Sequence, residues 1–326
     1  MLAFEAFAKT GLRKWNAMEI VNVVIPTLGK RGPELARAVD SALNQDGDFH
    51  VRVTVVFDGD EVPDELASDL AQKQDLTVVS NPSRRLAART VGARLGTADY
   101  VAFLDDDDYW FPDKLAVQVA RARMLRERGH VPIISSRVDQ FVLKNSQTIN
   151  NVPDTAITPS DRVEDYLFRK RSPSVRRNSL FTSTLLVDGN LARAVDWRRI
   201  PRHQDWDWLL RAQDEKRAVV SQVEESLVMI QVGSESSISA SSDWRASAEW
   251  ADTALKALAP GILSDFYAAQ VLRYALADRS LLGLKVAARG IRRSGALPSF
   301  SAVLVGLSGA VPRGVAERIF GRLGRS

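Results

Sequence analysis

Four consecutive aspartates, Asp105 to Asp108, are the residues of this chain best suited to chemistry. They come directly after the apolar run Val101–Leu104, and a helical pattern of apolar residues starts near Lys114. A buried strand that ends in carboxylates delivers them to the edge of an α/β sheet where ligands bind. Adjacent carboxylates repel one another, so their charges require a cation or hydrogen-bond donors nearby. Such oxygen ligands suit Mg²⁺ or Mn²⁺, although an acidic turn that merely caps the following helix explains the run equally well at this point.

Two other carboxylates occur where they could complete such a site. Asp58 follows the predicted strand 51–57, so the sheet would bring it to the same edge as the aspartate run. Asp205 lies in the sequence HQDWDWLLR at the start of a predicted helix, where the helix dipole stabilises a carboxylate. An ordinary N-cap with aromatic core residues behind it is the alternative interpretation of Asp205.

The segments that must position these residues alternate between strands and helices, which predicts βαβ units and a parallel sheet covered by helices. Apolar runs predict strands at 21–25, 51–57, 76–79 and 101–104, and helical spacing predicts helices at 34–43, 61–74, within 81–94 and at 115–128. Further strands are predicted from 133, at 138–143, at 180–187 and at 221–232, with a long surface loop at 144–162 and helices in the last third of the chain.

Composition excludes several classes of site and partner. The 326 residues are 45% hydrophobic and 26% charged, which is ordinary for a globular protein. Because the chain has no cysteine, disulfides and thiolate metal sites are excluded. The formal net charge of +4 is uneven, since residues 271–326 contain ten Lys or Arg and two acidic residues. A basic segment interleaved with apolar residues favours an anionic membrane surface over nucleic acid, and a solvated helical face that packs on the rest of the chain is the equal alternative.

No stretch has the pattern of a signal peptide or a membrane span. Residues 1–20 include Glu5 and Glu19 and are predicted to form a short amphipathic helix. The most apolar late stretch, 296–311, is interrupted by Pro298 and by two glycines, and it is shorter than the roughly 20 apolar residues that span a bilayer. We therefore expect a cytoplasmic protein, with attachment to the inner face of the cytoplasmic membrane as an option.

Four motifs, in this order, resemble glycosyltransferase family 2: VVIPTLGKRGPELARAVDSALNQ, VVFDGD, ARTVGARLGTADYVAFLDDDDYWFPDKL and HQDWDWLLR. The resemblance covers about residues 21–238. It implies the α/β GT-A fold, a Rossmann-like, mixed and mainly parallel sheet flanked by helices, here with a helical C-terminal extension. It divides the chain into an N-terminal helical extension at 1–20, a catalytic domain at 21–242 and a basic helical region at 243–326. It also implies inverting, metal-dependent transfer from a nucleoside-diphosphate sugar.

The resemblance assigns four residues to the donor nucleotide. Pro26 and Thr27 would end the first strand beside the nucleotide, Asp58 would accept a hydrogen bond from its base, and Arg89 would lie near it. The family often has two adjacent acids at the position of Asp58, whereas this chain has Phe57 in place of the first one.

The resemblance assigns the metal and the general base to two separate carboxylate groups. Asp105, Asp106 and Asp107 match the DxD motif; Asp107 would ligate Mg²⁺ or Mn²⁺, and Asp105 or Asp106 would support the ribose or the ion. Asp205 matches the base that takes the proton of the acceptor hydroxyl, opposite the leaving nucleoside diphosphate that the metal stabilises. Weaker candidates for contacts with the acceptor or a phosphate are His203, Trp206 and Arg176.

The expected reaction is transfer of a sugar, most often from a UDP-sugar in this family, to a glycan or lipid-linked saccharide during synthesis of a cell-surface polysaccharide. One rival is a nucleotidyltransferase acting on sugar phosphates, for which PTLGKRG offers a glycine-containing basic loop, but which leaves QDWDW without a purpose. A second rival is a catalytically degenerate module that only binds a sugar nucleotide. The single acid at Asp58 favours that rival slightly, and the intact Asp105–Asp107 and Asp205 oppose it.

Overall fold

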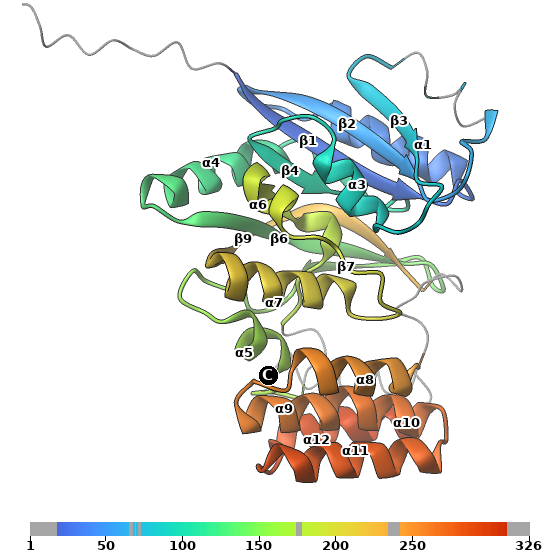
Figure 1. Cartoon of the computed structure of the whole chain (residues 1–326), viewed down its shortest axis with the longest axis vertical. Coiled ribbons are helices and arrows are strands. Elements are labelled where there is room, and N and C mark those ends of the chain that lie inside the picture. The colour runs from blue at the N-terminus through green and yellow to red at the C-terminus, as the bar shows by residue number, and fades with distance from the viewer. Residues whose placement is uncertain are drawn as a thin grey trace, which may run out of the picture.

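The first four strands of the chain are parallel and belong to its amino-terminal third (Figure 1). The computed structural model describes residues 18–64, 68, 70, 73–173, 178–233 and 242–311. Within them a sheet has the strand order β3-β2-β1-β4-β8-β6-β9-β5. The parallel strands are β1 (Glu19–Thr27), β2 (Phe49–Phe57), β3 (Leu76–Ser80) and β4 (Tyr100–Phe103). Because β1 has β2 on one side and β4 on the other, the carboxyl ends of β1 and β4 flank the switch point where open α/β sheets bind ligands.

The second half of the sheet mixes both strand directions. The antiparallel strand β8 (Leu186–Asp188) joins β4 to β6 (Val131–Val142), and β6 pairs in parallel with β9 (Ala218–Val232). The short strand β5 (Tyr109–Trp110) pairs with β9 and so fixes the chain just after the aspartate run. The predicted mixed α/β sheet is confirmed.

Helices cover both faces of this sheet because strand residues that point to either face are apolar. On β1, Val21, Val23 and Ile25 face one core cluster and Val24 faces the other. The helices α1 (Gly32–Leu43) and α4 (Lys114–Glu127) pack on the first face, whereas α3 (Ala88–Arg94), α6 (Gly189–Ala194) and α7 (Gln204–Lys216) pack on the second. A Cβ on Gly92 would lie 2.4 Å from the Val24 side chain, so this glycine permits the close approach of α3 to β1.

The C-terminal helices form a layer below the sheet and α7 (Figure 1). This layer consists of α8 (Trp244–Ala254), α9 (Pro260–Phe266), the π-helical turn Tyr267–Leu272, α10 (Arg273–Ala277), α11 (Leu281–Ser294) and α12 (Phe300–Leu307). Aromatic rings join the layer to the rest of the chain, since Phe168 of α5 (Val163–Phe168) meets Trp250 and Phe266 edge to face. No described helix is long and apolar enough to cross a membrane.

Several predicted elements need correction. The predicted loop 144–162 contains β7 (Gln147–Val152), a polar strand that pairs with β6 and lacks the apolar pattern of a buried strand. The predicted strand 180–187 is instead a 3-10 turn, Thr182–Thr184, followed by the short β8, because the turn bonds the aspartate run. Of the predicted N-terminal helix, residues 1–17 lie outside the described residues and Glu19 begins β1. The predicted helix 61–74 also falls partly outside them.

Candidate active site

The aspartate run forms a turn at the carboxyl end of β4, and Ser183 holds both ends of that turn. The Ser183 hydroxyl accepts a hydrogen bond from the backbone N–H of Asp105 (3.1 Å) and donates one to Oδ2 of Asp108 (2.5 Å). The other oxygen of Asp108 accepts a hydrogen bond from the backbone N–H of Gln231 on β9 (3.2 Å). Burial raises the pKa of Asp108 well above its usual value, and the charge of Asp105 adds to that effect. Asp108 is therefore the anchor of the turn rather than an exposed ligand.

Asp106 and Asp107 share the guanidinium of Arg31, which lies just before α1. Arg31 Nη1 donates to Asp106 Oδ1 at 3.1 Å and to Asp107 Oδ2 at 2.6 Å. The Thr27 hydroxyl, at the end of β1, donates to the other oxygen of Asp106 at 2.7 Å. The pKa of Asp107 is nevertheless raised, because burial and the charges of Asp105 and Asp106 outweigh the attraction of Arg31. The charged form of Asp107 is therefore disfavoured, mainly by burial, even beside Arg31.

Arg89 links the aspartate run electrostatically to Asp205. Its guanidinium, from α3, forms an ion pair with Asp105 and lies over the Trp197 ring. Asp205 lies in the first turn of α7, where its carboxylate accepts a hydrogen bond from the Trp206 backbone N–H (2.9 Å). Burial raises the pKa of Asp205 to about 6, while the Arg89 charge lowers it and the Asp105 charge raises it. A carboxyl with a pKa close to neutrality is suited to general-base work.

Asp58 stands at the end of β2 and is held by Arg199 and Asn81. Arg199 donates two hydrogen bonds to its carboxylate, at 3.0 and 2.9 Å, and the Asn81 side chain donates a third at 2.9 Å. Because β1 lies between β2 and β4, two strand spacings separate Asp58 from the aspartate run, roughly 10 Å along the sheet edge. Pro26, on β1 in register with Val56, lies at this edge between the two groups.

Two of the weaker candidates belong to the aromatic core. The His203 ring is buried, stacks on Trp206 with 4.5 Å between ring centroids, and bonds the Ser247 hydroxyl at 3.0 Å. Burial lowers the pKa of His203 to about 3, so the imidazole is neutral near pH 7. The Trp206 ring also meets Phe168 edge to face. Both rings therefore pack the C-terminal helices onto α7, and their contact with an acceptor or a phosphate stays a prediction. Arg176 lies outside the described residues.

Sequence reasoning did not predict that Arg31, Ser183 and Arg199 bond the carboxylates of the site. The loop PTLGKRG signalled a cation after the first strand, which is where Arg31 lies. Nothing near Ser183 or Arg199 in the sequence distinguishes them, because their partners lie 75 and 141 residues away.

The carboxylates fit a divalent cation that arrives with a diphosphate. No three His, Cys, Asp or Glu side chains converge on one point anywhere in the described residues. A metal at the turn would therefore have one or two protein carboxylates as ligands, and Mg²⁺ commonly binds in this way, with phosphate oxygens and water completing its shell. Burial, the largest cause of the raised pKa of Asp107, and the charges of Asp105 and Asp106 all disfavour the bare carboxylate, which a bound cation would stabilise.

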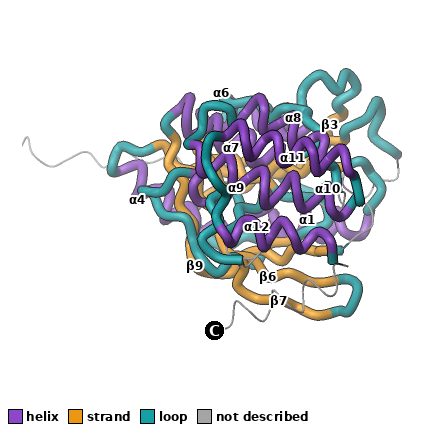
Figure 2. The backbone as a smooth tube through the Cα atoms, turned by 90° about the horizontal axis from the view of Figure 1, so that it is seen from below, coloured by secondary structure: helices purple, strands orange, loops and turns teal. Residues whose placement is uncertain are grey.

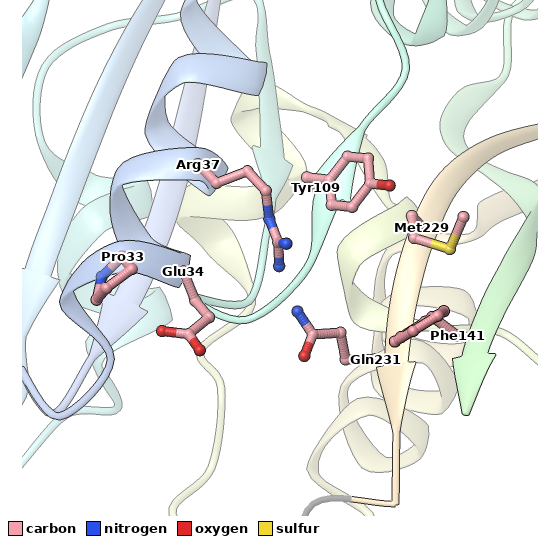
Figure 3. Close-up of a pocket in the computed structure, with 7 residues that line it drawn as sticks. All are labelled: Pro33, Glu34, Arg37, Tyr109, Phe141, Met229 and Gln231. Carbon is pink, nitrogen blue, oxygen red and sulfur yellow. The ribbon is translucent and has the colours of Figure 1, made fainter. Parts of the chain in front are cut away.

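A cavity of about 450 Å³ opens beside the aspartate turn (Figure 3). Its lining is contributed by α1, β5, β6 and β9 and consists of Pro33, Glu34, Arg37, Tyr109, Phe141, Met229 and Gln231. Arg37 lies 4.7 Å from the centroid of the Tyr109 ring and donates to the backbone oxygen of Asp107 at 3.3 Å. Figure 3 shows the polar ends of Glu34, Arg37 and Gln231 gathered between α1 and β9. The cavity thus combines ring faces with hydrogen-bonding groups and shares a wall with the aspartate turn.

Comparisons with known proteins point to a family and a fold. The sequence profile described as Glycosyl transferase family 2 matches residues 22–180. The chain is 31% identical over 127 residues to the amylovoran biosynthesis glycosyltransferase AmsB of Erwinia amylovora, covering 38% of this chain and 40% of that protein. It is 39% identical over 107 residues to the succinoglycan biosynthesis protein ExoW of Rhizobium meliloti (strain 1021), covering 30% of this chain and 32% of that protein. The match therefore spans two-fifths or less of the length of these curated relatives.

A solved structure, S. aureus TarS 1–349 in complex with UDP-GlcNAc, is similar over 88% of this chain and 90% of its own. The TM-score is 0.52 and the sequence identity 12%, a level that shows a shared fold. The fold similarity confirms the GT-A architecture that the resemblance implied.

Proposed function

Because residues 22–180 of this chain match the profile of glycosyl transferase family 2, we propose that it is an inverting glycosyltransferase that uses a nucleoside-diphosphate sugar. The observation that carries the proposal is the placement of Asp205. Burial raises its pKa to about 6, and the charge of Asp105, which is paired with Arg89, raises that pKa further. One carboxylate is thereby suited to accept a proton, while the separate carboxylates of the turn after β4 are available as oxygen ligands for a cation.

In the proposed reaction the donor lies along the carboxyl ends of β2, β1 and β4. Asp58 accepts a hydrogen bond from the nucleobase, and Arg89 and Arg31 provide positive charge near the diphosphate. Asp205 takes the proton of the acceptor hydroxyl as that oxygen attacks the anomeric carbon from the face opposite the leaving group. A Mg²⁺ or Mn²⁺ held by Asp107, with Asp105 or Asp106 in support, would neutralise the departing diphosphate.

A UDP-sugar is the proposed donor and a saccharide the proposed acceptor. The structural neighbour TarS was solved with UDP-GlcNAc, and the curated relatives are named for amylovoran and succinoglycan biosynthesis. The cavity beside the turn suits a sugar unit of the acceptor, because Tyr109 and Phe141 offer ring faces and Glu34 and Gln231 offer partners for hydroxyl groups. We place the reaction in the synthesis of a cell-surface polysaccharide on a glycan or lipid-linked acceptor, at the cytoplasmic side of the membrane.

The two rivals are less well supported. Arg31 of the PTLGKRG loop bonds Asp106 and Asp107, so the loop is explained without a nucleotidyltransferase. A binding module without activity would need no carboxyl with a pKa near 6 beside the aspartate turn.

The test is a two-part assay on the full chain with Mn²⁺. A thermal-shift screen of nucleoside diphosphates and their sugars identifies the donor, and release of the nucleoside diphosphate in the presence of oligosaccharides measures transfer. Asp205→Asn should abolish transfer and leave the thermal shift by the donor unchanged, whereas Asp107→Ala should lose the metal-dependent part of that shift. Wild-type turnover in Asp205→Asn would refute the base assignment. Donor binding without turnover on any acceptor would favour the degenerate module.

A further inference from the structure

The helices α11 and α12 expose large apolar side chains that do not pack into the core. Five of the ten exposed large hydrophobic residues among the described residues fall between 281 and 307. They are Leu281 (76% exposed), Leu282 (56%), Leu297 (89%), Phe300 (77%) and Leu307 (50%). Single exposed leucines are common on protein surfaces, but a concentration on two consecutive helices marks an interaction surface.

The same helices carry cations and no acids. Residues 281–311 contain four Lys or Arg and no Asp or Glu. On α11 the buried positions Gly283, Ala287 and Gly290 form one stripe, which packs on Trp244, Ala275 and Tyr267. The basic side chains of Lys285, Arg289 and Arg292 are exposed and lie on the opposite stripe with Leu281, as the helical period of 3.6 requires.

The two helices lie at one end of the molecule. Figure 1 places α11 and α12 at the end farthest from β1 and β2, and Figure 2 shows the C-terminal helices as the layer nearest a viewer at that end. Both pack on the segment from α9 to α10: Gly290 of α11 is against Tyr267, and Gly306 of α12 is against the backbone of Ala268. A planar partner could therefore approach α11 and α12 without meeting the sheet.

We propose that this apolar-basic face docks on a bilayer that contains anionic lipids. The face consists of Leu281, Leu282, Lys285, Arg289 and Arg292 of α11, Leu297 of the connection, and Phe300 and Leu307 of α12. The apolar side chains enter the boundary between headgroups and acyl chains, and the cations bind the lipid phosphates. Stable attachment of a peripheral protein takes two such signals together.

The charges argue against the other occupants of this face. In a two-fold dimer the patch would meet itself, so the cations of α11 would oppose their own copies in a surface without acids. Nucleic acid would use the cations but leave Phe300 and the leucines without a partner. The purpose of docking, access to a lipid-linked acceptor, rests on the proposed function, whereas the binding itself does not.

The test is co-sedimentation of the full-length protein with vesicles of phosphatidylcholine alone or with about one-third phosphatidylglycerol. The charge variant Lys285→Gln/Arg289→Gln/Arg292→Gln removes three cations, and at about 1 kcal/mol for each basic residue near an anionic surface it should bind about 100-fold more weakly. The apolar variant Leu281→Ser/Leu297→Ser/Phe300→Ser should also lose binding. The control Leu95→Ser/Met124→Ser, which changes exposed apolar residues elsewhere, should bind as the wild type does.

The outcomes separate the alternatives. All replaced side chains are exposed, so thermal unfolding should change little, and transfer to a soluble oligosaccharide should persist in every variant. The proposal is overturned if the wild type does not bind anionic vesicles, or binds neutral ones equally well. It is also overturned if sedimentation velocity finds a dimer that the apolar variant makes monomeric. Absence of transfer by the wild type to any acceptor would refute the proposed function and leave the vesicle result intact.

Discussion

Arg31 lies 2.6 Å from Asp107, nitrogen to oxygen, so the chain's own guanidinium holds the carboxylate that the family resemblance assigns to the metal. The same nitrogen also donates to Asp106. A cation that binds at Asp107 must therefore share this carboxylate with Arg31 or displace it. In the second case, the freed guanidinium lies next to the proposed diphosphate and can bind it.

Removal of Arg31 should separate metal binding from donor binding. A hydrogen bond to a charged group contributes about 1.5–3 kcal/mol, so Arg31→Ala should bind Mn²⁺ alone at least about tenfold more tightly. The same variant should bind the nucleoside diphosphate more weakly, because a cation near the phosphates is lost. Titration of free Mn²⁺ by electron paramagnetic resonance and calorimetry with the nucleotide measure the two effects. Arg94→Ala, which breaks an exposed ion pair with Asp196, is the control. An unchanged affinity for Mn²⁺ would contradict the competition.

The pH dependence of transfer should follow Asp205. A general base acts only when deprotonated, and the pKa of Asp205 is raised to about 6 by burial. We expect kcat/KM to rise with pH, to reach half of its maximum near pH 6, and to level off above about pH 7. Neutralising Arg89 with Arg89→Gln removes a charge that lowers this pKa, so the midpoint should move to higher pH. A midpoint near pH 4 would show that the group responsible is not Asp205.

The carboxyl of Asp205 should lower the free energy of unfolding at neutral pH. Because the pKa of Asp205 is higher in the folded chain than in the unfolded chain, folding favours its protonated form. Its contribution to stability is full below about pH 4 and is lost as the pH rises through about 6, with a total of about 3 kcal/mol. Asp205→Asn should therefore raise the free energy of unfolding at pH 7.5 by up to that amount and change it little at pH 4.

A second carboxylate of the same helix provides the matched control for that experiment. Asp207 is buried and accepts hydrogen bonds from Arg211 (2.9 Å) and the Trp250 indole (3.2 Å). Asp207→Asn leaves the partly buried guanidinium of Arg211 without its counter-charge, so it should destabilise the protein by roughly 3 kcal/mol at pH 7.5. Urea denaturation of both variants at pH 4 and pH 7.5 measures whether the free energy of unfolding at pH 7.5 rises in Asp205→Asn and falls in Asp207→Asn. Equal destabilisation by both substitutions would show that Asp205 is a structural carboxylate.

Arg199 should compete with the nucleobase for Asp58. Its two hydrogen bonds occupy both carboxylate oxygens, and its own pKa is raised mainly by that contact. If the base must bond Asp58, then Arg199→Ala should strengthen binding of the nucleoside diphosphate several-fold, while Asp58→Ala should weaken it at least tenfold. Calorimetry measures both. Weaker binding in Arg199→Ala would mean that Arg199 itself contacts the donor.

The sequence predicted those parts of the site that one strand and its following residues specify. Asp105 and Asp58 follow apolar runs that β4 and β2 confirm, and parallel pairing through β1 puts their ends at one edge. The pairing partners of the carboxylates could not be predicted in this way. Arg199 and Ser183 reach the site because segments distant in sequence are packed beside it, and no local pattern records such packing.

Errors in the predicted elements have a similar physical origin. The polar strand β7 has no buried face, so its sequence resembles that of a loop, and it is ordered by pairing with β6. The segment near Leu180 is apolar enough for a strand, yet hydrogen bonds from Ser183 to the aspartate run impose a turn there. In both cases tertiary contacts, rather than the local sequence preference, determine the structure.

Ser183 should therefore be a positioning residue for the whole carboxylate turn. Its hydroxyl bonds Asp108 and the backbone of Asp105, so Ser183→Ala leaves a buried carboxyl with one donor fewer and should cost about 1–3 kcal/mol of stability. A purely structural role would end there. If the turn also aims Asp107 at the metal, the variant should need a several-fold higher Mn²⁺ concentration for half-maximal transfer, at a temperature where it remains folded. Ser308→Ala, which removes a hydroxyl bonded to the backbone oxygen of Val305 far from the turn, should leave that concentration unchanged. An unaltered Mn²⁺ requirement in folded Ser183→Ala would limit Ser183 to stabilising the fold.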